Sequence, residues 1–388
     1  MNQVYLDNSS TTKPCKTAAE YVTEAVLQNW GNPSSLHRLG VEAEKLLTEC
    51  RNAAASLIGA DSSEIFFTSG GTESNNIALK GAAYALRRRG KRIVTSAIEH
   101  PSVLQTLDEL EKEGFEVVRL HPDENGEITP QSVWDAVNSE TILVSLMLVN
   151  NETGVYLPVR EAKKAVKDKN APALIHCDAV QAFGKMPISV ADLGVDLLSA
   201  SAHKIHGIKG CGILYKSRAA RIVPTVFGGN QEKGIRSGTE SVPAIAGLLG
   251  AIRELDVENT RRKMTELNLY ARDVLSQIDG IHINSGENTL PFILNISLEG
   301  YRSETLLHFL ESCEIYVSSG SACSKGKPSY VLTESRLPQK FADSALRLSF
   351  SRFNKTEDID RLADALREAK TALRRSDGGR IERLRRKH

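Results

Sequence analysis

Seven short apolar runs recur along the first 215 residues of the chain, and their spacing predicts a layered α/β fold. They lie at 65–67, 93–98, 117–120, 142–149, 173–177, 197–198 and 212–215. Most are separated by segments with helical periodicity, such as 74–89, 102–113 and 159–169. Near-continuous apolar strands that alternate with helices are typical of a parallel sheet covered on both faces. We therefore expect an α/β fold with a large domain built on a mostly parallel seven-stranded sheet.

The pattern changes near Pro243, where one long helical stretch is predicted to run to about Gln277. Shorter strand-like runs then alternate with helical segments, at 281–284, 292–297, 303–311, 315–317, 346–350 and 356–373. This pattern predicts a smaller α/β domain that the N-terminal segment joins. The predicted division is a large domain at 14–256, a small domain at 1–13 and 257–375, and a flexible basic tail at 376–388.

Composition narrows the class of protein. The 388 residues are 41% hydrophobic and 25% charged, and the formal net charge of +1 gives no global reason to bind nucleic acid. No apolar run approaches the length of a membrane span, and the first residues lack a basic region followed by an apolar stretch. The six cysteines are scattered without CxxC spacing. We expect a cytoplasmic protein with free thiols that binds neither nucleic acid nor a membrane.

Lys204 and Asp178 carry the first candidate chemistry. Asp178 ends an apolar strand and Gln181 follows it, while Lys204 closes the run 199–204 (SASAHK) after the next strand. Each feature alone is ordinary, since an aspartate after a strand is usually a helix cap and exposed lysines are common. Together they match the needs of a pyridoxal phosphate enzyme, in which a lysine forms a Schiff base and a carboxylate pairs with the pyridinium nitrogen.

A glycine turn lies beside these residues. The stretch 68–76 (TSGGTESNN) follows a strand and opens a helix, so its backbone N–H groups are able to bind a phosphate. An ordinary strand–helix turn, in which Ser or Thr caps the helix, is an alternative interpretation of the same residues. The GxxxxGK[ST] pattern of a P-loop is absent. Other polar residues also follow strands, including Asn151. Because ligands bind at the carboxyl ends of parallel strands, we expect the candidate chemistry to converge on one edge of the sheet.

Cys323 differs from the other cysteines. It lies in 318–326 (SSGSACSKG), and a polar loop beside lysines favours a reactive thiolate. Cys177 and Cys211 lie in apolar runs and are expected to be inert core thiols. His203, His206 and Cys211 match no usual zinc spacing, so no metal is expected.

Arg347 is an arginine within the strand-like alternation 345–349 (ALRLS). It has two interpretations: an exposed strand position, or a guanidinium that binds a substrate carboxylate through two parallel hydrogen bonds.

Taken together, these residues resemble the NifS-like cysteine desulfurases of the class V aminotransferase group. The resemblance runs from residue 5 to about Phe353 and rests on ordered motifs, at 5–12 (YLDNSSTT), 31–37 (GNPSSLH), 68–76, 99–100 (EH), 149–154 (VNNETG), 199–204, 236–239 (RSGT), 318–324 and 345–349. It implies the type I fold of pyridoxal phosphate enzymes and a homodimer.

The resemblance also implies roles for single residues. Lys204 carries the cofactor and moves protons, Asp178 holds the pyridinium proton, and His100 stacks over the ring as an acid or base. The remaining implied cofactor contacts are Gln181 and Asn151 at the phenolic oxygen, Gly71, Thr72, Ser201 and His203 at the phosphate, and Thr239 reaching the phosphate from the other subunit. Arg347 and Asn32 bind the substrate L-cysteine. Cys323 attacks its sulfur, which leaves a persulfide on the enzyme and releases alanine.

Sulfur is then expected to pass to an acceptor protein, for iron–sulfur cluster assembly or for thiolation of cofactors or tRNA. The alternatives are a selenocysteine lyase or an aminotransferase of the same fold, a catalytically silent scaffold, and a nucleotide-binding protein. A simple aminotransferase needs no thiol nucleophile such as Cys323. A silent scaffold is expected to lose Lys204, Asp178 or Cys323, and all three remain.

Overall fold

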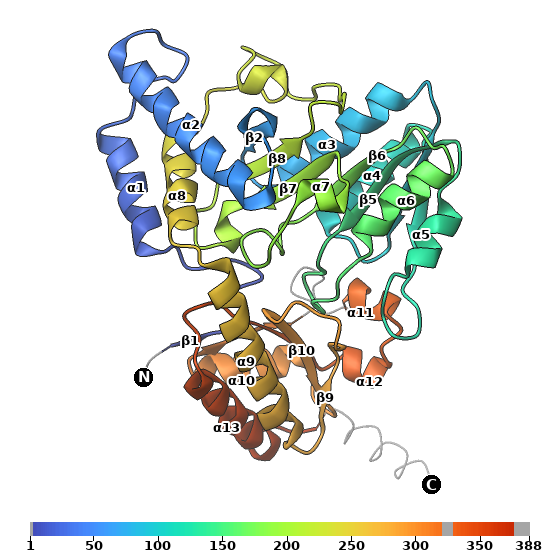
Figure 1. The fold of residues 1–388 in the computed structure, drawn as a ribbon. Helices are drawn as coiled ribbons and strands as arrows, with labels where there is room; N and C mark the ends of the chain where they lie inside the picture. The colour runs from blue at the N-terminus through green and yellow to red at the C-terminus, as the bar shows by residue number, and fades with distance from the viewer. Residues whose placement is uncertain (1–2, 320–328, 376–388) are drawn as a thin grey trace.

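The central element is a seven-stranded sheet, seen in a computed structural model that describes residues 3–319 and 329–375 (Figure 1). Its strands, in spatial order, are β2 (Ile65–Thr68), β8 (Gly212–Lys216), β7 (Leu197–Ser201), β6 (Leu174–Asp178), β5 (Thr141–Met147), β3 (Arg92–Ser96) and β4 (Glu116–Leu120). Strand β8 is antiparallel to both its neighbours, and the other adjacent pairs are parallel. The predicted mostly parallel seven-stranded sheet is confirmed.

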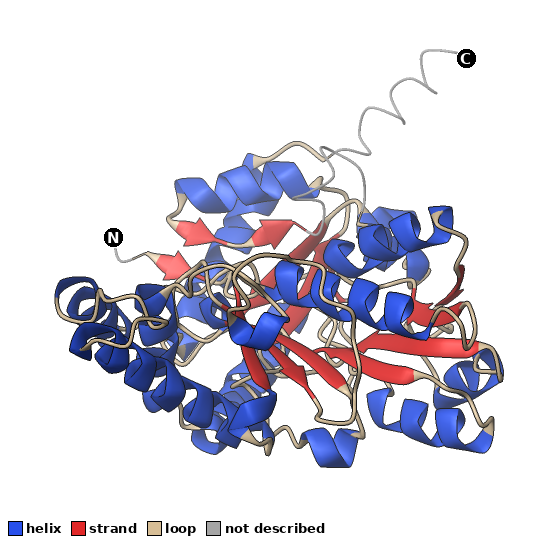
Figure 2. Ribbon diagram, turned by 90° about the horizontal axis from the view of Figure 1, so that it is seen from above, coloured by secondary structure: helices blue, strands red, loops and turns tan. Residues whose placement is uncertain are grey.

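Helices cover this sheet on both faces (Figure 2). Their bounds are α1 (Lys16–Leu27), α2 (Arg38–Ile58), α3 (Gly71–Leu86), α4 (Pro101–Lys112), α5 (Pro130–Ala136), α6 (Val159–Asp168), α7 (Val190–Leu193) and α8 (Val242–Arg253). Successive side chains of one strand enter opposite layers, as when Ile93 packs with α3 and α4 while Val94 joins the core beneath α2 and α6. This alternation within unbroken apolar strands is what a sheet buried on both faces requires.

A second sheet of four strands lies in the C-terminal part of the chain (Figure 1). Its order is β12 (Ser318–Ser319), β13 (Ala345–Ser349), β10 (Ile293–Leu298) and β9 (Ile281–Ile283). The accompanying helices are α9 (Val257–Ser276), α10 (Ser303–Ser312), α11 (Tyr330–Glu334), α12 (Gln339–Ala342) and α13 (Thr356–Ala372). The single long helix expected from Pro243 to Gln277 is wrong. Residues 254–256 interrupt the helix. Asp256 then caps the start of α9 by accepting a hydrogen bond from Asn259 N at 3.2 Å.

The N-terminal segment connects the two sheets. Strand β1 (Val4–Tyr5) pairs in parallel with β11 (Ile315–Tyr316). Ser9 N then donates to Ser349 Oγ on β13 at 2.8 Å, and Thr12 N donates to His203 O, beyond β7, at 2.9 Å. The segment therefore ties the second sheet to the loop that carries Lys204.

A buried ion pair fixes β2, the strand that leads into the glycine turn. Arg51 on α2 binds both carboxylate oxygens of Glu232 at 2.8 Å and also donates to Ile65 O. The same Glu232 carboxylate accepts from Phe67 N at 2.9 Å, and its side chain is 1% exposed. Removing the carboxylate would leave a buried guanidinium without its counter-charge.

We therefore expect Glu232→Ala to lower the free energy of unfolding by about 3–5 kcal/mol. Glu49→Ala removes the partner of Arg253 from a pair in which both side chains are about half exposed. It should cost less than about 1 kcal/mol, because exposed pairs gain little. Urea unfolding of both variants measures the difference, and equal losses would contradict a special role for the buried pair.

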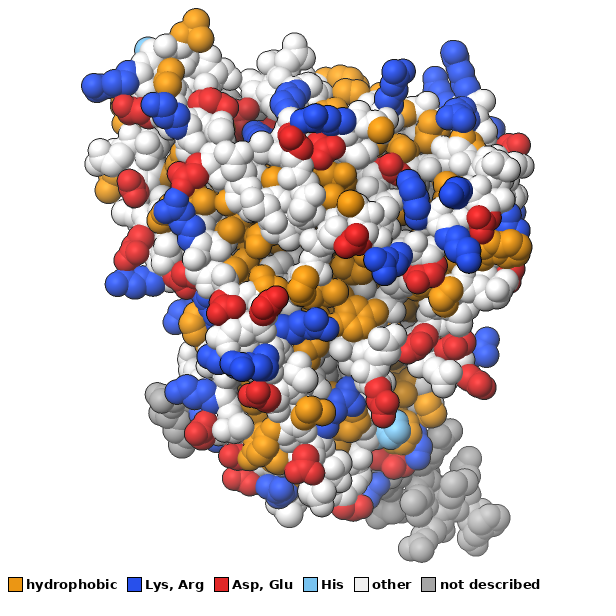
Figure 3. Space-filling model, viewed as in Figure 1, with side chains coloured by type: hydrophobic (Ala, Val, Ile, Leu, Met, Phe, Trp, Pro, Cys, Tyr) orange, Lys and Arg blue, Asp and Glu red, His pale blue; other side chains and the backbone are white. Residues whose placement is uncertain are grey.

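The surface carries both signs of charge. The face drawn in Figure 3 interleaves lysine and arginine with aspartate and glutamate over both parts of the molecule. This mixture agrees with the net charge of +1. Within residues 3–319 and 329–375, no helix has the length and apolarity to cross a membrane.

Candidate active site

A cavity of ≈ 360 Å³ lies at the carboxyl ends of the parallel strands. Ten of the predicted site residues line it, namely Gly71, Thr72, His100, Asn151, Asp178, Gln181, Ser201, His203, Lys204 and Arg347. Gly71 and Thr72 are the first residues of α3, which follows β2, and Arg347 comes from β13 of the second sheet. The other seven come from the segments that follow β3, β5, β6 and β7 or from the last residues of β6 and β7. The structure thus brings these predicted residues together at one edge of the sheet, as expected.

The glycine turn brings the backbone of Gly70 close to strand β8, at the N-terminus of α3. A side chain at Gly212, the first residue of β8, would place its Cβ 2.5 Å from Gly70 Cα. Helix α3 begins at Gly71, and Gly70 provides no side-chain cap. The positive end of a 16-residue helix therefore faces the cavity beside Thr72. This geometry suits a phosphate group.

Lys204 reaches into the cavity from the single turn that follows β7. Its Nζ donates to Ser9 O at 2.5 Å and to Ser10 O at 2.7 Å. Burial, together with the nearby Arg347 guanidinium, lowers the pKa of this amine from 10.5 to about 8, although Asp7 and Asp178 act in the opposite direction. The uncharged amine, which is the nucleophilic form, is therefore accessible near neutral pH.

Asp178 is the last residue of β6 and is 5% exposed. Its Oδ1 accepts from Val180 N at 3.0 Å and its Oδ2 from Asn75 Nδ2 at 2.8 Å. Among the described residues it forms no ion pair. A buried carboxylate with only neutral donors is costly unless a cation joins it, so this site fits a protonated ring nitrogen.

His100 stands at the start of α4, where Ser102 N donates to its Nδ1 at 3.1 Å. In the neutral ring this acceptor role leaves the proton on Nε2. Burial lowers the pKa of His100 below 6.5, although Asp178 acts in the opposite direction. The side chain is thus a neutral imidazole in the cavity wall, which suits stacking and proton transfer.

Amide and imidazole groups complete the wall. Asn151 Oδ1 is buried without a partner among the described residues, and Gln181 Nε2 donates to Ser9 O at 3.0 Å. His203 Nδ1 lies 3.2 Å from Thr11 Oγ1, and burial together with Lys204 lowers the pKa of His203 to about 4. These uncharged groups are able to form hydrogen bonds with a polar ligand. One of them, Asn151 Oδ1, is a buried acceptor that has no donor among the described residues.

Arg347 is not an exposed strand residue, because it is only 7% exposed. Its Nη2 donates to Asp7 Oδ1 at 2.9 Å and to Ser10 Oγ at 2.6 Å, while Nη1 donates to Asn151 O at 3.1 Å. The Nε atom is buried without a partner in the described part of the chain. A substrate carboxylate would therefore meet a guanidinium that Asp7 already orients.

Two predicted residues, Thr239 and Asn32, lie elsewhere. Thr239 lines a separate cavity of ≈ 130 Å³ together with Ser69 and Arg236. Asn32 is exposed in the loop between α1 and α2, where its Oδ1 accepts from Ser34 N. Cys323 lies outside the described residues. Neither Thr239 nor Asn32 lines the 360 Å³ cavity of its own chain.

Sequence reasoning missed Asn75, Ser9 and Ser10 as parts of the site. Asn75 lies one turn of α3 beyond Gly71 and Thr72, so helical spacing places it on the same face. Its position in the 68–76 motif was a usable signal. Both serines bind Lys204 through backbone carbonyls, which leave no signature in residue type, and Ser10 also accepts from Arg347 through its Oγ.

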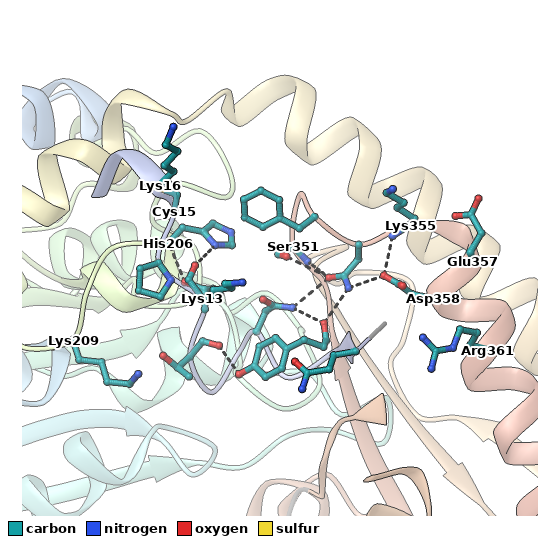
Figure 4. Close-up of a pocket in the computed structure, with 18 residues that line it drawn as sticks. Lys13, Cys15, Lys16, His206, Lys209, Ser351, Lys355, Glu357, Asp358 and Arg361 are labelled. Atoms are coloured by element: carbon teal, nitrogen blue, oxygen red, sulfur yellow. Dashed lines mark hydrogen bonds between the residues drawn. The ribbon is translucent and has the colours of Figure 1, made fainter. Parts of the chain in front are cut away.

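A larger cavity of ≈ 1040 Å³ lies on the other side of the N-terminal segment, between that segment and α13 (Figure 4). Lys13, Lys16, Lys209 and Lys355 line it, with Glu357 and Asp358 on α13. None of the predicted site residues is among its described lining residues. His206 faces this cavity, whereas its neighbours His203 and Lys204 face the smaller one.

Comparisons with known proteins identify the family of the chain. The model of the aminotransferase class-V family matches residues 4–362. A NifS/IcsS protein homolog from Lactobacillus delbrueckii subsp. bulgaricus is 44% identical over 94% of this chain and 96% of its own length. The cysteine desulfurase IscS of Methanosarcina thermophila is 41% identical over 96% and 93%.

Solved structures support the same family and the same fold. A NifS-like protein superposes with a TM-score of 0.91 at 36% identity, covering 96% of this chain and all of its own. The NifS-like protein of Rickettsia africae reaches 0.85 at 30% identity with the same coverage. The type I fold and the resemblance drawn from the motifs are confirmed. The chain belongs to the aminotransferase class-V family, among its NifS-like cysteine desulfurases.

Proposed function

We propose that the 360 Å³ cavity binds pyridoxal phosphate and that the chain uses it to take sulfur from L-cysteine. The observation that carries the proposal is the buried Asp178, which has neutral donors on both oxygens and no ion-pair partner within the described part of the chain. Pyridoxal phosphate supplies that cation as a pyridinium and, when bound, stabilises negative charge at the substrate Cα.

The chain's own residues then have distinct tasks. Lys204 would hold the cofactor through its aldehyde and would carry a proton, for which the lowered pKa of its amine suits it. The N-terminus of α3, with Gly71 and Thr72, holds the phosphate together with Ser201 and His203. His100 covers the ring, and Asn151 and Gln181 face the phenolic oxygen.

Arg347 and Cys323 are the residues proposed to act on the substrate. Arg347 orients the substrate carboxylate, and Asn32 is proposed to assist from the loop before α2. The Cys323 thiolate attacks the substrate sulfur, so that an S–S bond forms as the C–S bond breaks and alanine is released. The persulfide then passes its sulfur to an acceptor protein. The described cysteines are all free, as in a reducing cytoplasm, where we propose that the protein acts.

We further propose a homodimer in which Thr239 of one chain reaches the phosphate site of the other. Its placement outside the cavity of its own chain supports this arrangement. The division into domains at residue 256 also stays a prediction.

One assay tests the proposed activity. Purified protein with pyridoxal phosphate and L-cysteine should form alanine and, with a reductant present, an equal amount of sulfide. Without reductant, alanine should form only until Cys323 is loaded. Absence of alanine in both reactions would contradict the proposal.

The pKa of Lys204 predicts how the cofactor-free protein takes up pyridoxal phosphate. Only the uncharged amine attacks the aldehyde, and its pKa is about 8 instead of 10.5. The rate of attachment should therefore rise about tenfold per pH unit below that value and level off above it. Stopped-flow absorbance measures the rate. A rate still rising steeply above pH 9 would show an ordinary lysine.

A further inference from the structure

Lys185 is a buried lysine that the reaction described above does not use. It is 5% exposed and lies in the turn after β6, four residues beyond Gln181. Gly184 turns the chain at this point with a φ of +68°, and a Cβ there would lie 2.9 Å from Ile205. The glycine thus lets the backbone pass close to the Lys204 loop while the lysine side chain stays inside.

The amine of Lys185 holds one end of the Gln181 amide. Lys185 Nζ donates to Gln181 Oε1 at 3.2 Å, and Gln181 Nε2 donates to Ser9 O at 3.0 Å. A backbone carbonyl only accepts, so the NH₂ end must face Ser9 and the oxygen must face Lys185. One N–H of the amide is then used by Ser9, and the second remains for the cavity that Gln181 lines.

Burial and the charged groups around Lys185 disfavour its protonated form. The charged groups that act on it are Lys204 and Arg347, which are both cations, and with burial they lower its pKa to about 7. The Phe292 ring gives only a distant cation–π contact, with its centroid 5.8 Å from Nζ. A methionine of similar length would fill the same space without the desolvation cost. The hydrogen bond to Gln181 is therefore the specific contribution that a lysine makes here.

We propose that Lys185 is a positioning residue, which orients Gln181 so that its amide donates an N–H to the phenolic oxygen of the cofactor. This inference rests on the proposed function, because it assigns Gln181 to that oxygen. It adds a residue that acts on the cofactor only through another side chain.

The test is a pH titration of the visible absorbance of bound pyridoxal phosphate. Without the Lys185 donor, the Gln181 amide is free to rotate and the phenolic oxygen loses a hydrogen bond. The oxygen then holds its proton to higher pH, so Lys185→Met should raise the midpoint by about one pH unit. Loss of the Lys185 charge alone moves the midpoint in the same direction, so the single variant does not separate the two causes.

A double-mutant cycle separates them. If Lys185 acts through Gln181, adding Lys185→Met to Gln181→Met should shift the midpoint by less than about 0.3 unit. A pure charge effect would give the same shift in both backgrounds and overturn the inference. Lys216→Met is the matched control, because Lys216 also donates hydrogen bonds within the protein, to Ser217 O and Ala220 O, but lies at the far end of β8. It should leave the midpoint unchanged.

Two further outcomes are informative. If Lys185→Met does not fold, as judged by its thermal unfolding curve, Lys185→Leu removes the same donor with a smaller side chain and takes its place in the cycle. An unshifted midpoint in a folded Lys185 variant overturns the role proposed for Lys185 but leaves the proposed function standing. Failure of the wild-type protein to bind pyridoxal phosphate overturns the proposed function as well, so the two failures are distinguishable.

Discussion

Lys204→Ala should abolish turnover of L-cysteine, with a fall in kcat of at least about 10³-fold. The substitution removes the one amine that the cavity offers among its described residues, and with it both the covalent link and the proton carrier. Cofactor binding should weaken but persist, because the α3 N-terminus, Asp178 and His203 remain. Borohydride reduction followed by peptide mass spectrometry should find the pyridoxyl group on Lys204 in the wild-type protein and nowhere in the variant.

Lys209→Ala is the matched control for this experiment. Lys209 lies five residues further on, is exposed, and lines the larger cavity. Its loss should leave turnover and the borohydride product unchanged. A pyridoxyl group on Lys185 or any other lysine of the Lys204→Ala protein would show that the cofactor-linking residue is assigned wrongly.

The chemistry at the sheet edge was predictable because it depends on strand order and strand ends. Asp178 and Lys204 follow neighbouring apolar runs, and parallel strands bring their carboxyl ends to one edge whatever the helices do. The glycine turn was readable for the same reason, since 68–76 joins a strand to a helix. Residue type and local position were sufficient for these parts of the site.

Other parts depend on contacts between distant segments. The carbonyl oxygens of Ser9 and Ser10 meet Lys204 only because the N-terminal segment crosses from β13 to the loop after β7. The pairing of Arg347 with Asp7 arises from the same crossing. No local pattern encodes these contacts.

The break at 254–256 was missed for a different reason. Helix-forming residues continue on both sides of it, and helical periodicity alone does not reveal a change of direction. Arg352, from the second part of the chain, binds the carboxylate and the carbonyl oxygen of Glu254 at this point. Tertiary contacts therefore add to the Asp256 cap in ending one helix and starting the next.

Cys323→Ser should separate sulfur transfer from cofactor chemistry. Cys323 is far in sequence from Lys204 and Asp178, and no described contact of either residue needs it. The variant should therefore bind pyridoxal phosphate and L-cysteine with the absorbance changes of the wild-type protein. Alanine formation should fall by more than about 10²-fold, because a hydroxyl does not replace a thiolate in attack on sulfur.

The persulfide gives this prediction a direct readout. Wild-type protein treated with L-cysteine without reductant should carry one additional sulfur on the peptide that contains Cys323. Cys313→Ser provides the control, because Cys313 is a free and partly exposed thiol only ten residues away. That variant should keep both its alanine formation and the sulfur on Cys323. Undiminished alanine from Cys323→Ser, or additional sulfur found on Cys313, would assign the nucleophile to another thiol, since the cavity itself contains no cysteine among its described residues.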